Sequence, residues 1–221
     1  MKQQALPAQD SFNRLIVAAV GKFAALGLEG TSTRDIAREA NVALSAISYH
    51  FGSKTDLYRA AVQHAVDWMV TPLEATLAKA QSVISSDPSR DEIVDMLIEL
   101  TGAVADIMLA PGEEGEAATQ LAIRELVIPN AAKDIVAKGV VEPIVAYAAT
   151  LLQLLDIPGY DRKQIAVEAT VLFGPITVYR ILNNHDFGAM GIAEARAIQE
   201  SVRRATRRNI MALIESESRA P

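Results

Sequence analysis

Hydroxyl-bearing and small side chains gather on one side of a short segment near the N-terminus. The stretch is ANVALSAISYHFGSKTDLY, residues 40–58. At about 100° per residue, a helix over residues 43–51 separates two groups of side chains. One side carries Leu44, Ser45, Ser48 and Tyr49, and the other carries Ala43, Ala46, Ile47 and His50. Hydroxyls donate and accept hydrogen bonds, and small residues allow a close approach, so the first side is suited to recognising another surface.

A second short helix precedes this one and supplies the context for it. Ser32-Thr33-Arg34-Asp35 is a helix-capping pattern, and it predicts a helix to about Ala40, followed by a tight turn at Asn41-Val42. Two short helices joined in this way form a helix-turn-helix, whose second helix lies in the DNA major groove. Serine contacts bases or phosphate, and an apolar side chain such as Leu44 meets a thymine methyl group.

The ends of the two helices carry groups that suit phosphate contacts. Those residues are Thr33, Tyr49, His50 and Lys54. The alternative is that the short helix is an ordinary connector in a helical bundle and that Lys54 is an ordinary solvated lysine.

The sequence predicts no enzyme active site, metal site or cofactor. There is no cysteine, and His50, His64 and His185 are scattered without zinc-ligand spacing. No Gly-x-Ser-x-Gly motif occurs. Gly21-Lys22 fails as a phosphate loop because Ile16 stands at the first glycine position and Phe23 at the Ser/Thr position.

Nearly every segment has helical periodicity, so the expected fold class is all-α. Proline, glycine and the stretch Ser85–Ser89 mark the breaks, with Thr71-Pro72, Pro111-Gly112, Pro129, Pro158-Gly159 and Gly174-Pro175 among them. Helices are expected at about 10–26, 33–40, 43–51, 54–68, 71–83, 91–109, 113–127, 131–138, 140–155, 161–182 and 193–215. We expect a three-helix DNA-binding domain over residues 1–55 and a helical ligand-binding and dimerisation domain over residues 56–221.

The net charge of −6 is distributed unevenly. Residues 1–66 hold seven Lys/Arg against five Asp/Glu, whereas the remainder holds fourteen against twenty-two. This difference is expected if the two parts meet different partners. The longest apolar-rich run, Ile144–Leu155, is shorter than a bilayer span. With no signal peptide visible and no cysteine, we expect a cytoplasmic protein without a membrane partner.

Residues 12–58 resemble the N-terminal domain of TetR-type transcriptional regulators. The likeness lies in the long first helix, in Thr31–Ala37 and in Tyr49–Lys54 before Leu57. The resemblance implies a dimeric, ligand-responsive regulator, usually a repressor. It implies phosphate contacts by Thr33, Tyr49, His50 and Lys54 and base contacts by Leu44, Ser45, Ala46 and Ser48. Ser48 and Ser45 stand where the family often has Tyr and Gly, which bears on the DNA sequence contacted.

The helix over 161–182 is apolar almost all round, so it needs cover on both sides. With residues 140–155 it would build a four-helix homodimer interface, placing two reading helices about 34 Å apart. The alternative is a central helix inside a monomer. Ile123–Leu126 before Pro129, together with FGPITVYR, resemble the CecR-like C-terminal domain of part of this family over about residues 115–182.

Met and aromatic side chains suit an adaptable apolar pocket for a small-molecule effector, although the alternative of plain core is favoured for each one taken singly. The candidates are Trp68, Met69, Met96, Met108, Tyr147, Phe173 and Tyr179. Glu125 lies in the middle of an apolar stripe, where a carboxylate needs a partner. Arg124, Arg180 or a ligand cation are the expected partners. The basic run of Arg203, Arg204, Arg207 and Arg208 is expected to be a solvated face.

The sequence therefore predicts a repressor that a small molecule releases from a palindromic DNA operator. Two alternatives stay open: an α-helical small-molecule-binding dimer that no longer reads DNA, and an activator in place of a repressor.

Overall fold

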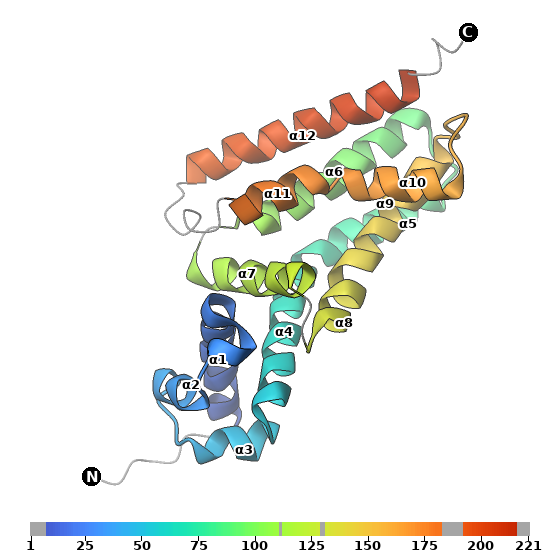
Figure 1. The fold of residues 1–221 in the computed structure, drawn as a ribbon. Coiled ribbons are helices and arrows are strands. Elements are labelled where there is room, and N and C mark those ends of the chain that lie inside the picture. The colour runs from blue at the N-terminus through green and yellow to red at the C-terminus, as the bar shows by residue number, and fades with distance from the viewer. Residues whose placement is uncertain (1–7, 111, 129–130, 183–191, 216–221) are drawn as a thin grey trace. The chain divides into compact units, whose positions relative to one another are not determined.

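The structure is a computed structural model that describes residues 8–110, 112–128, 131–182 and 192–215. These residues form helices and contain no β-strand, which confirms the all-α fold (Figure 1). The elements are α1 (Ala8–Gly30), α2 (Thr33–Glu39), α3 (Ser45–Phe51), α4 (Lys54–Val70), η1 (Thr71–Leu73), α5 (Glu74–Ile84), α6 (Arg90–Met108), α7 (Glu113–Val127), α8 (Lys133–Val136), η2 (Ala137–Val141), α9 (Glu142–Leu154), α10 (Arg162–Val171), α11 (Gly174–Leu182) and α12 (Ile192–Glu215). Pro111, Pro129 and His185 lie outside the described residues.

The chain forms two compact units, and the first of them is discontinuous in sequence. Unit 1 falls within residues 1–69 and 113–139 and holds α1–α4, α7 and α8. Unit 2 falls within residues 70–112 and 140–221 and holds α5, α6 and α9–α12. The domains expected at residues 1–55 and 56–221 are defined by function and not by compactness, so that boundary stays a prediction.

Unit 1 buries one face of each of its first four helices. The core comprises Leu15, Ile16, Ala19 and Phe23 of α1, Ile36 and Ala37 of α2, Ile47 of α3, and Leu57, Tyr58 and Ala61 of α4. The ring of Phe23 meets Tyr58 edge to face, with centroids 4.8 Å apart. The apolar positions recur three and four residues apart, so the same periodicity that predicts these helices also determines which face is buried.

The end of α1 differs from the prediction that the helix stops at about Leu26. Regular helical geometry is interrupted at Gly27 (φ 71°), and helix continues to Gly30. The hydroxyl of Thr31 donates to the Gly27 carbonyl at 2.6 Å, which holds the kink. A Cβ at Gly27 would lie 2.5 Å from Nη2 of Arg124, so the glycine lets the α7 guanidinium pack against the α1 backbone.

Glu125 is fully buried in unit 1, and its carboxylate is held by groups other than those expected. The hydroxyl of Tyr58 on α4 donates to Oε1. The backbone N–H of Ala132 donates to Oε2 at 2.9 Å. The two oxygens accept from Tyr58 and Ala132 where Arg124 or Arg180 is the expected partner, and the expected contact with a ligand cation stays a prediction. Sequence periodicity shows that Glu125 lies on a buried face. It does not show which distant groups meet that face, so it does not identify the Tyr58 hydroxyl and the Ala132 amide as the donors.

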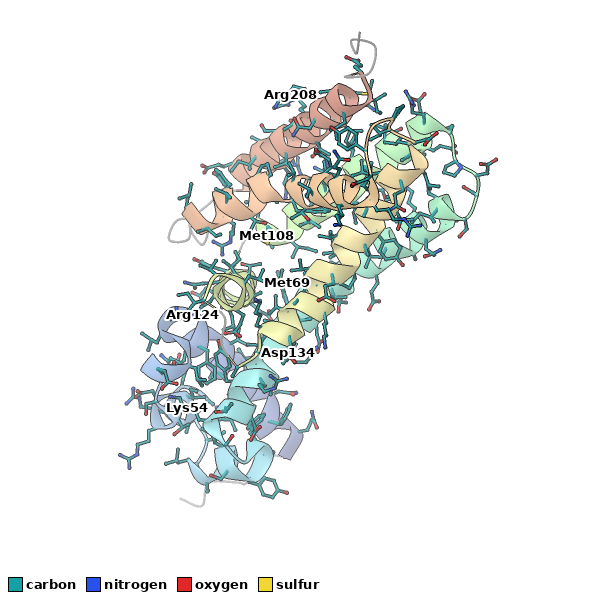
Figure 2. The ribbon with its side chains drawn as sticks, turned by 45° about the vertical axis from the view of Figure 1, so that its right-hand side comes forward. Lys54, Met69, Met108, Arg124, Asp134 and Arg208 are labelled. Atoms are coloured by element: carbon teal, nitrogen blue, oxygen red, sulfur yellow. The ribbon has the colours of Figure 1, made fainter. Side chains whose placement is uncertain are left out.

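A second link joins α4 to the same segment after α7. The guanidinium of Arg59 forms a fork with the Asp134 carboxylate, with N···O distances of 3.1 and 3.0 Å. It also donates to the carbonyl of Ala131. The arginine lowers the pKa of the Asp134 carboxyl, chiefly through this hydrogen bond. Figure 2 labels Asp134 beside α4.

Two separate helices are expected at 131–138 and 140–155, but the structure joins them through the π-helical turn Ala137–Val141. Pro143 has no N–H to donate, and its ring would clash with the carbonyl four residues earlier, that of Gly139. A wider turn avoids this clash. A Cβ at Gly139 would lie 2.6 Å from Cγ1 of Val66, so a glycine here permits close packing on α4.

Unit 2 is organised by α6 and α12, which pack along each other. Arg203 pairs with Asp106 at 3.0 Å and Arg207 with Asp95 at 2.8 Å, so half of the basic run is engaged with α6. The expectation of a solvated face is confirmed for Arg204, Arg207 and Arg208, which are exposed, whereas Arg203 is half-buried. The starts of α6 and α10 carry capping boxes, Ser89 with Glu92 and Asp161 with Gln164.

Three stretches are long and apolar enough, by length and composition alone, to cross a membrane. They are Gln9–Gly30, Lys133–Leu154 and Arg162–Leu182. The expectation of no membrane partner is based on the longest apolar-rich run, Ile144–Leu155. Each of these three helical stretches is longer than that run. Each of the three also packs against other helices in the structure, as α1 does with α7 and α9 with α10.

The buried Tyr58–Glu125 contact predicts a pH-dependent stability. Burial, and next the hydrogen bond from Tyr58 to Glu125, raise the pKa of the Tyr58 hydroxyl above its usual value of about 10. The stabilisation is therefore complete below about pH 10 and is lost as pH rises through the raised folded-state pKa. Tyr58→Phe should lower the free energy of unfolding by about 1–3 kcal/mol at neutral pH, because Glu125 loses a donor.

Urea unfolding of both proteins at neutral pH and above about pH 10 measures this. The wild type should lose its advantage over Tyr58→Phe in alkali. A difference that stays constant with pH would contradict the role given to the Tyr58 hydroxyl.

Candidate nucleic-acid interface

Helices α2 and α3 form a helix-turn-helix with well-defined ends. Ser32 caps α2 by accepting the Arg34 N–H at 3.2 Å. Asn41 takes the left-handed conformation (φ 52°) and turns the chain. Gly52 (φ 79°) ends α3, and the Ser53 side chain then caps α4 by accepting the Asp56 N–H at 3.1 Å.

The inner face of α3 is anchored on α1. Ile47 is 4% exposed. The ring of Phe51 stacks on Phe12 with centroids 5.0 Å apart. The imidazole Nε2 of His50 lies 2.8 Å from the Ser11 hydroxyl, in hydrogen-bond contact. His50 therefore helps to hold α3 on α1, and its expected phosphate contact stays a prediction.

The outer face of α3 is open. Tyr49 is 79% exposed and Leu44 is 45% exposed, and Ser45 and Ser48 are also exposed. Leu44 lies at the N-cap position because the helix begins at Ser45 and not at Ala43. The four residues expected to face outwards, Leu44, Ser45, Ser48 and Tyr49, are thus all exposed in the structure.

The remaining DNA-binding candidates are less exposed. Ala46, Thr33 and Lys54 are half-buried, with Lys54 at the first residue of α4 (Figure 2). Sequence reasoning missed Arg34, the second residue of α2, which is exposed and beside Thr33. The signal was available, since a cation in the first turn of the first helix of a helix-turn-helix is placed to meet a phosphate.

The eight predicted effector contacts do not gather at one described groove. Trp68, Met69 and Glu125 belong to unit 1, and Met96, Met108, Tyr147, Phe173 and Tyr179 belong to unit 2. A groove of about 900 Å³ in unit 1 is lined by Trp68. A groove of about 490 Å³ between α11 and α12 is lined by Tyr179. Met69, Met96, Met108 and Phe173 are core residues of their units, and Tyr147 is half-buried.

Known proteins agree with this architecture. Residues 15–61 match the family model described as bacterial regulatory proteins, tetR family. The HTH-type transcriptional dual regulator CecR of Shigella flexneri is 26% identical over 169 residues, which are 76% of this chain and 74% of that protein. The probable HTH-type transcriptional regulator YttP of Bacillus subtilis is 31% identical over 88 residues, 40% of this chain and 41% of that one.

Solved structures show the same fold. A TetR-family regulator from Mesorhizobium loti has a TM-score of 0.57 at 18% identity, covering 96% of this chain and 98% of that one. FadR from Bacillus subtilis, solved in complex with stearoyl-CoA, has a TM-score of 0.59 at 14% identity, covering 88% and 97%. At such identities the likeness is one of fold.

An exposed reading helix on a tightly packed helix-turn-helix defines the class: a DNA-binding transcriptional regulator and not an enzyme. Within that class, residues 15–61 match the TetR family of bacterial regulatory proteins, and the chain is similar to the HTH-type regulator CecR over 76% of its length. The expected similarity to CecR is also confirmed, over a longer part of the chain than residues 115–182.

The two faces of α3 should respond differently to truncation. Ile47→Ala should lower the free energy of unfolding by about 2–5 kcal/mol, because it opens a cavity in the core. Leu44→Ala should change it by less than about 0.5 kcal/mol, because Leu44 touches solvent. Urea denaturation of the two variants tests this. Equal losses would show that the outer face is also packed.

Proposed function

We propose that the protein is a repressor that binds a palindromic operator as a homodimer and is released by a small-molecule effector. The observation that carries the DNA-binding part is the open face of α3, held by buried Ile47 and by Phe51 on Phe12. The small and hydroxyl-bearing residues of this face suit direct contact with base edges, and Thr33, Arg34 and Lys54 suit phosphates.

Apolar residues on α10 and α11 support the homodimer. They are exposed although their helices also contribute to the core of unit 2: Val167 (60%), Val171 (48%), Val178 (54%), Ile181 (39%) and Leu182 (77%). A large apolar patch on a soluble protein is typical of a subunit interface. Two copies joined on a twofold axis would present two α3 helices to the half-sites of one palindrome.

The contacts of α4 support effector control. This helix begins three residues after α3 ends. Tyr58 ties it to Glu125 on α7, and Arg59 ties it to Asp134 in the segment that follows α7. A ligand that favours one arrangement of these helices would move α4 and with it α3. Affinities for effector and operator are then reciprocally coupled. FadR, a protein of the same fold, was solved with stearoyl-CoA, which supports a small-molecule effector. FadR is also a transcriptional regulator, and a regulator that binds DNA is expected in the cytoplasm, which supports a cytoplasmic location.

Selection from a random duplex pool tests the DNA-binding part. The purified protein should enrich one palindrome over several rounds. The double variant Tyr49→Ala, Lys54→Ala should weaken binding to it by tenfold or more, because it removes two expected phosphate contacts, one near the C-terminal end of α3 and one at the start of α4. Affinity of the wild type should also fall steeply as salt rises.

Lys133→Ala is the matched control, since Lys133 is an exposed lysine of unit 1 on α8, away from α3 in sequence. It should leave operator affinity unchanged. If no sequence is enriched at low salt, or if the control weakens binding as much as the double variant, the proposed reading surface is wrong.

Sedimentation analysis tests the dimer. Val171→Glu places a charge in the exposed apolar patch and should convert a dimer to a monomer, because an unpaired charge is costly to bury. Ser82→Glu on α5 is the control, as it adds the same charge at an exposed position outside the patch. A wild-type protein that sediments as a monomer, or a Val171→Glu variant that stays dimeric, would refute this interface.

A further inference from the structure

The larger groove lies in unit 1, the same unit that holds the reading helix. Its volume is about 900 Å³, at the upper end of the roughly 300–1,000 Å³ of small-molecule sites. Helices α1, α4 and α7 build its walls, with the end of α2 at one side (Figure 1). The apolar part of the lining comprises Val17, Ala18, Ala25, Leu26, Ala117 and Ala118.

The charges in the groove do not balance. Lys22 is paired with Glu39 at 3.3 Å, and Arg14 faces Asp10 at 4.0 Å. Glu113 and Glu114 are exposed, and neither has an ion-pair or hydrogen-bond partner among the described residues. Because the cations already face carboxylates, the uncompensated charge of the groove is negative.

An aromatic side chain in the wall of the groove also suits an organic cation. Trp68 lies in the wall and is half-buried, and an indole face attracts a cation with a strength that grows as water is excluded. His64 also lines the groove, and its Nε2 is buried without a hydrogen-bond partner among the described residues. Because this nitrogen is covered by the protein, the aromatic contact in the groove rests on Trp68.

We propose that this groove binds amphipathic organic cations, with the apolar body against α1 and α7, the positive charge near Glu113 and Glu114, and an aromatic contact to Trp68. The site goes beyond the proposed function, since its occupation needs no DNA. It also contacts α1, whose Phe12 and Ser11 hold α3, so that an occupant acts on the helix that carries the reading surface.

Trp68 is the single tryptophan of the chain, so its fluorescence reports on the groove directly. The probe is tetraphenylphosphonium, and the matched control is tetraphenylborate, which has the same shape and the opposite charge. The cation should change Trp68 emission saturably in the absence of DNA, and the anion should not. Binding should weaken with rising salt, because exposed charges are screened.

Variants locate the site. Glu113→Gln with Glu114→Gln should raise the dissociation constant of the cation about tenfold, as expected for two partly screened charges. Trp68→Leu, followed by calorimetry, should raise it about fivefold. Glu29→Gln is the control, because Glu29 is an exposed carboxylate of α1 that does not line the groove, and it should have no effect. Unchanged thermal melting would show that the variants fold.

Three results would overturn the proposal: no saturable binding by calorimetry, equal binding of the two ions, or full affinity in the Glu113→Gln, Glu114→Gln variant. Every measurement is made without DNA. A protein that fails to select an operator can therefore still bind the cation, and a protein that selects an operator can still fail to bind the cation.

Discussion

The DNA-binding surface depends on the burial of one side of a seven-residue helix. An isolated helix of this length is unstable in water, since nucleation costs more than so few hydrogen bonds return. Helix α3 is therefore ordered by its contacts with α1: Ile47 in the core, Phe51 on Phe12, and His50 against Ser11. Because these contacts use only the inner face, they fix the orientation of the outer face and leave Ser45, Ser48 and Tyr49 exposed.

The interior of unit 1 extends this constraint to α4. A carboxylate as deeply buried as that of Glu125 is tolerated only when both oxygens have donors, and Tyr58 and the Ala132 amide supply them. Those donors come from α4 and from the segment after α7, so the buried charge fixes how the two meet. Removing either donor leaves one buried carboxylate oxygen without a partner, which destabilises the arrangement that holds α4 and, through it, α3.

Local rules predict the helices well because caps and breakers act within a few residues. Ser32, Ser89 and Asp161 begin their helices, and Gly52 ends α3. The outer face of α3 follows from periodicity for the same reason. Long-range pairing does not follow: Tyr58 and Glu125 are 67 residues apart, and no local pattern announces that the second meets the first. The effector candidates were chosen by residue type, and type alone does not separate a packed methionine such as Met96 from a groove residue such as Trp68.

Local charge, more than net charge, decides whether an acidic chain can approach DNA. Screening limits the reach of exposed charges to about 10 Å at moderate salt. Within the helix-turn-helix, the carboxylates are engaged: Asp35 pairs with Arg38 at 2.6 Å, and Asp56 accepts the Ser53 hydroxyl. Arg34 and Lys54 have no such carboxylate partner among the described residues. The acidic surplus is concentrated after residue 66, outside the helix-turn-helix in sequence, and it includes the two carboxylates that open α7.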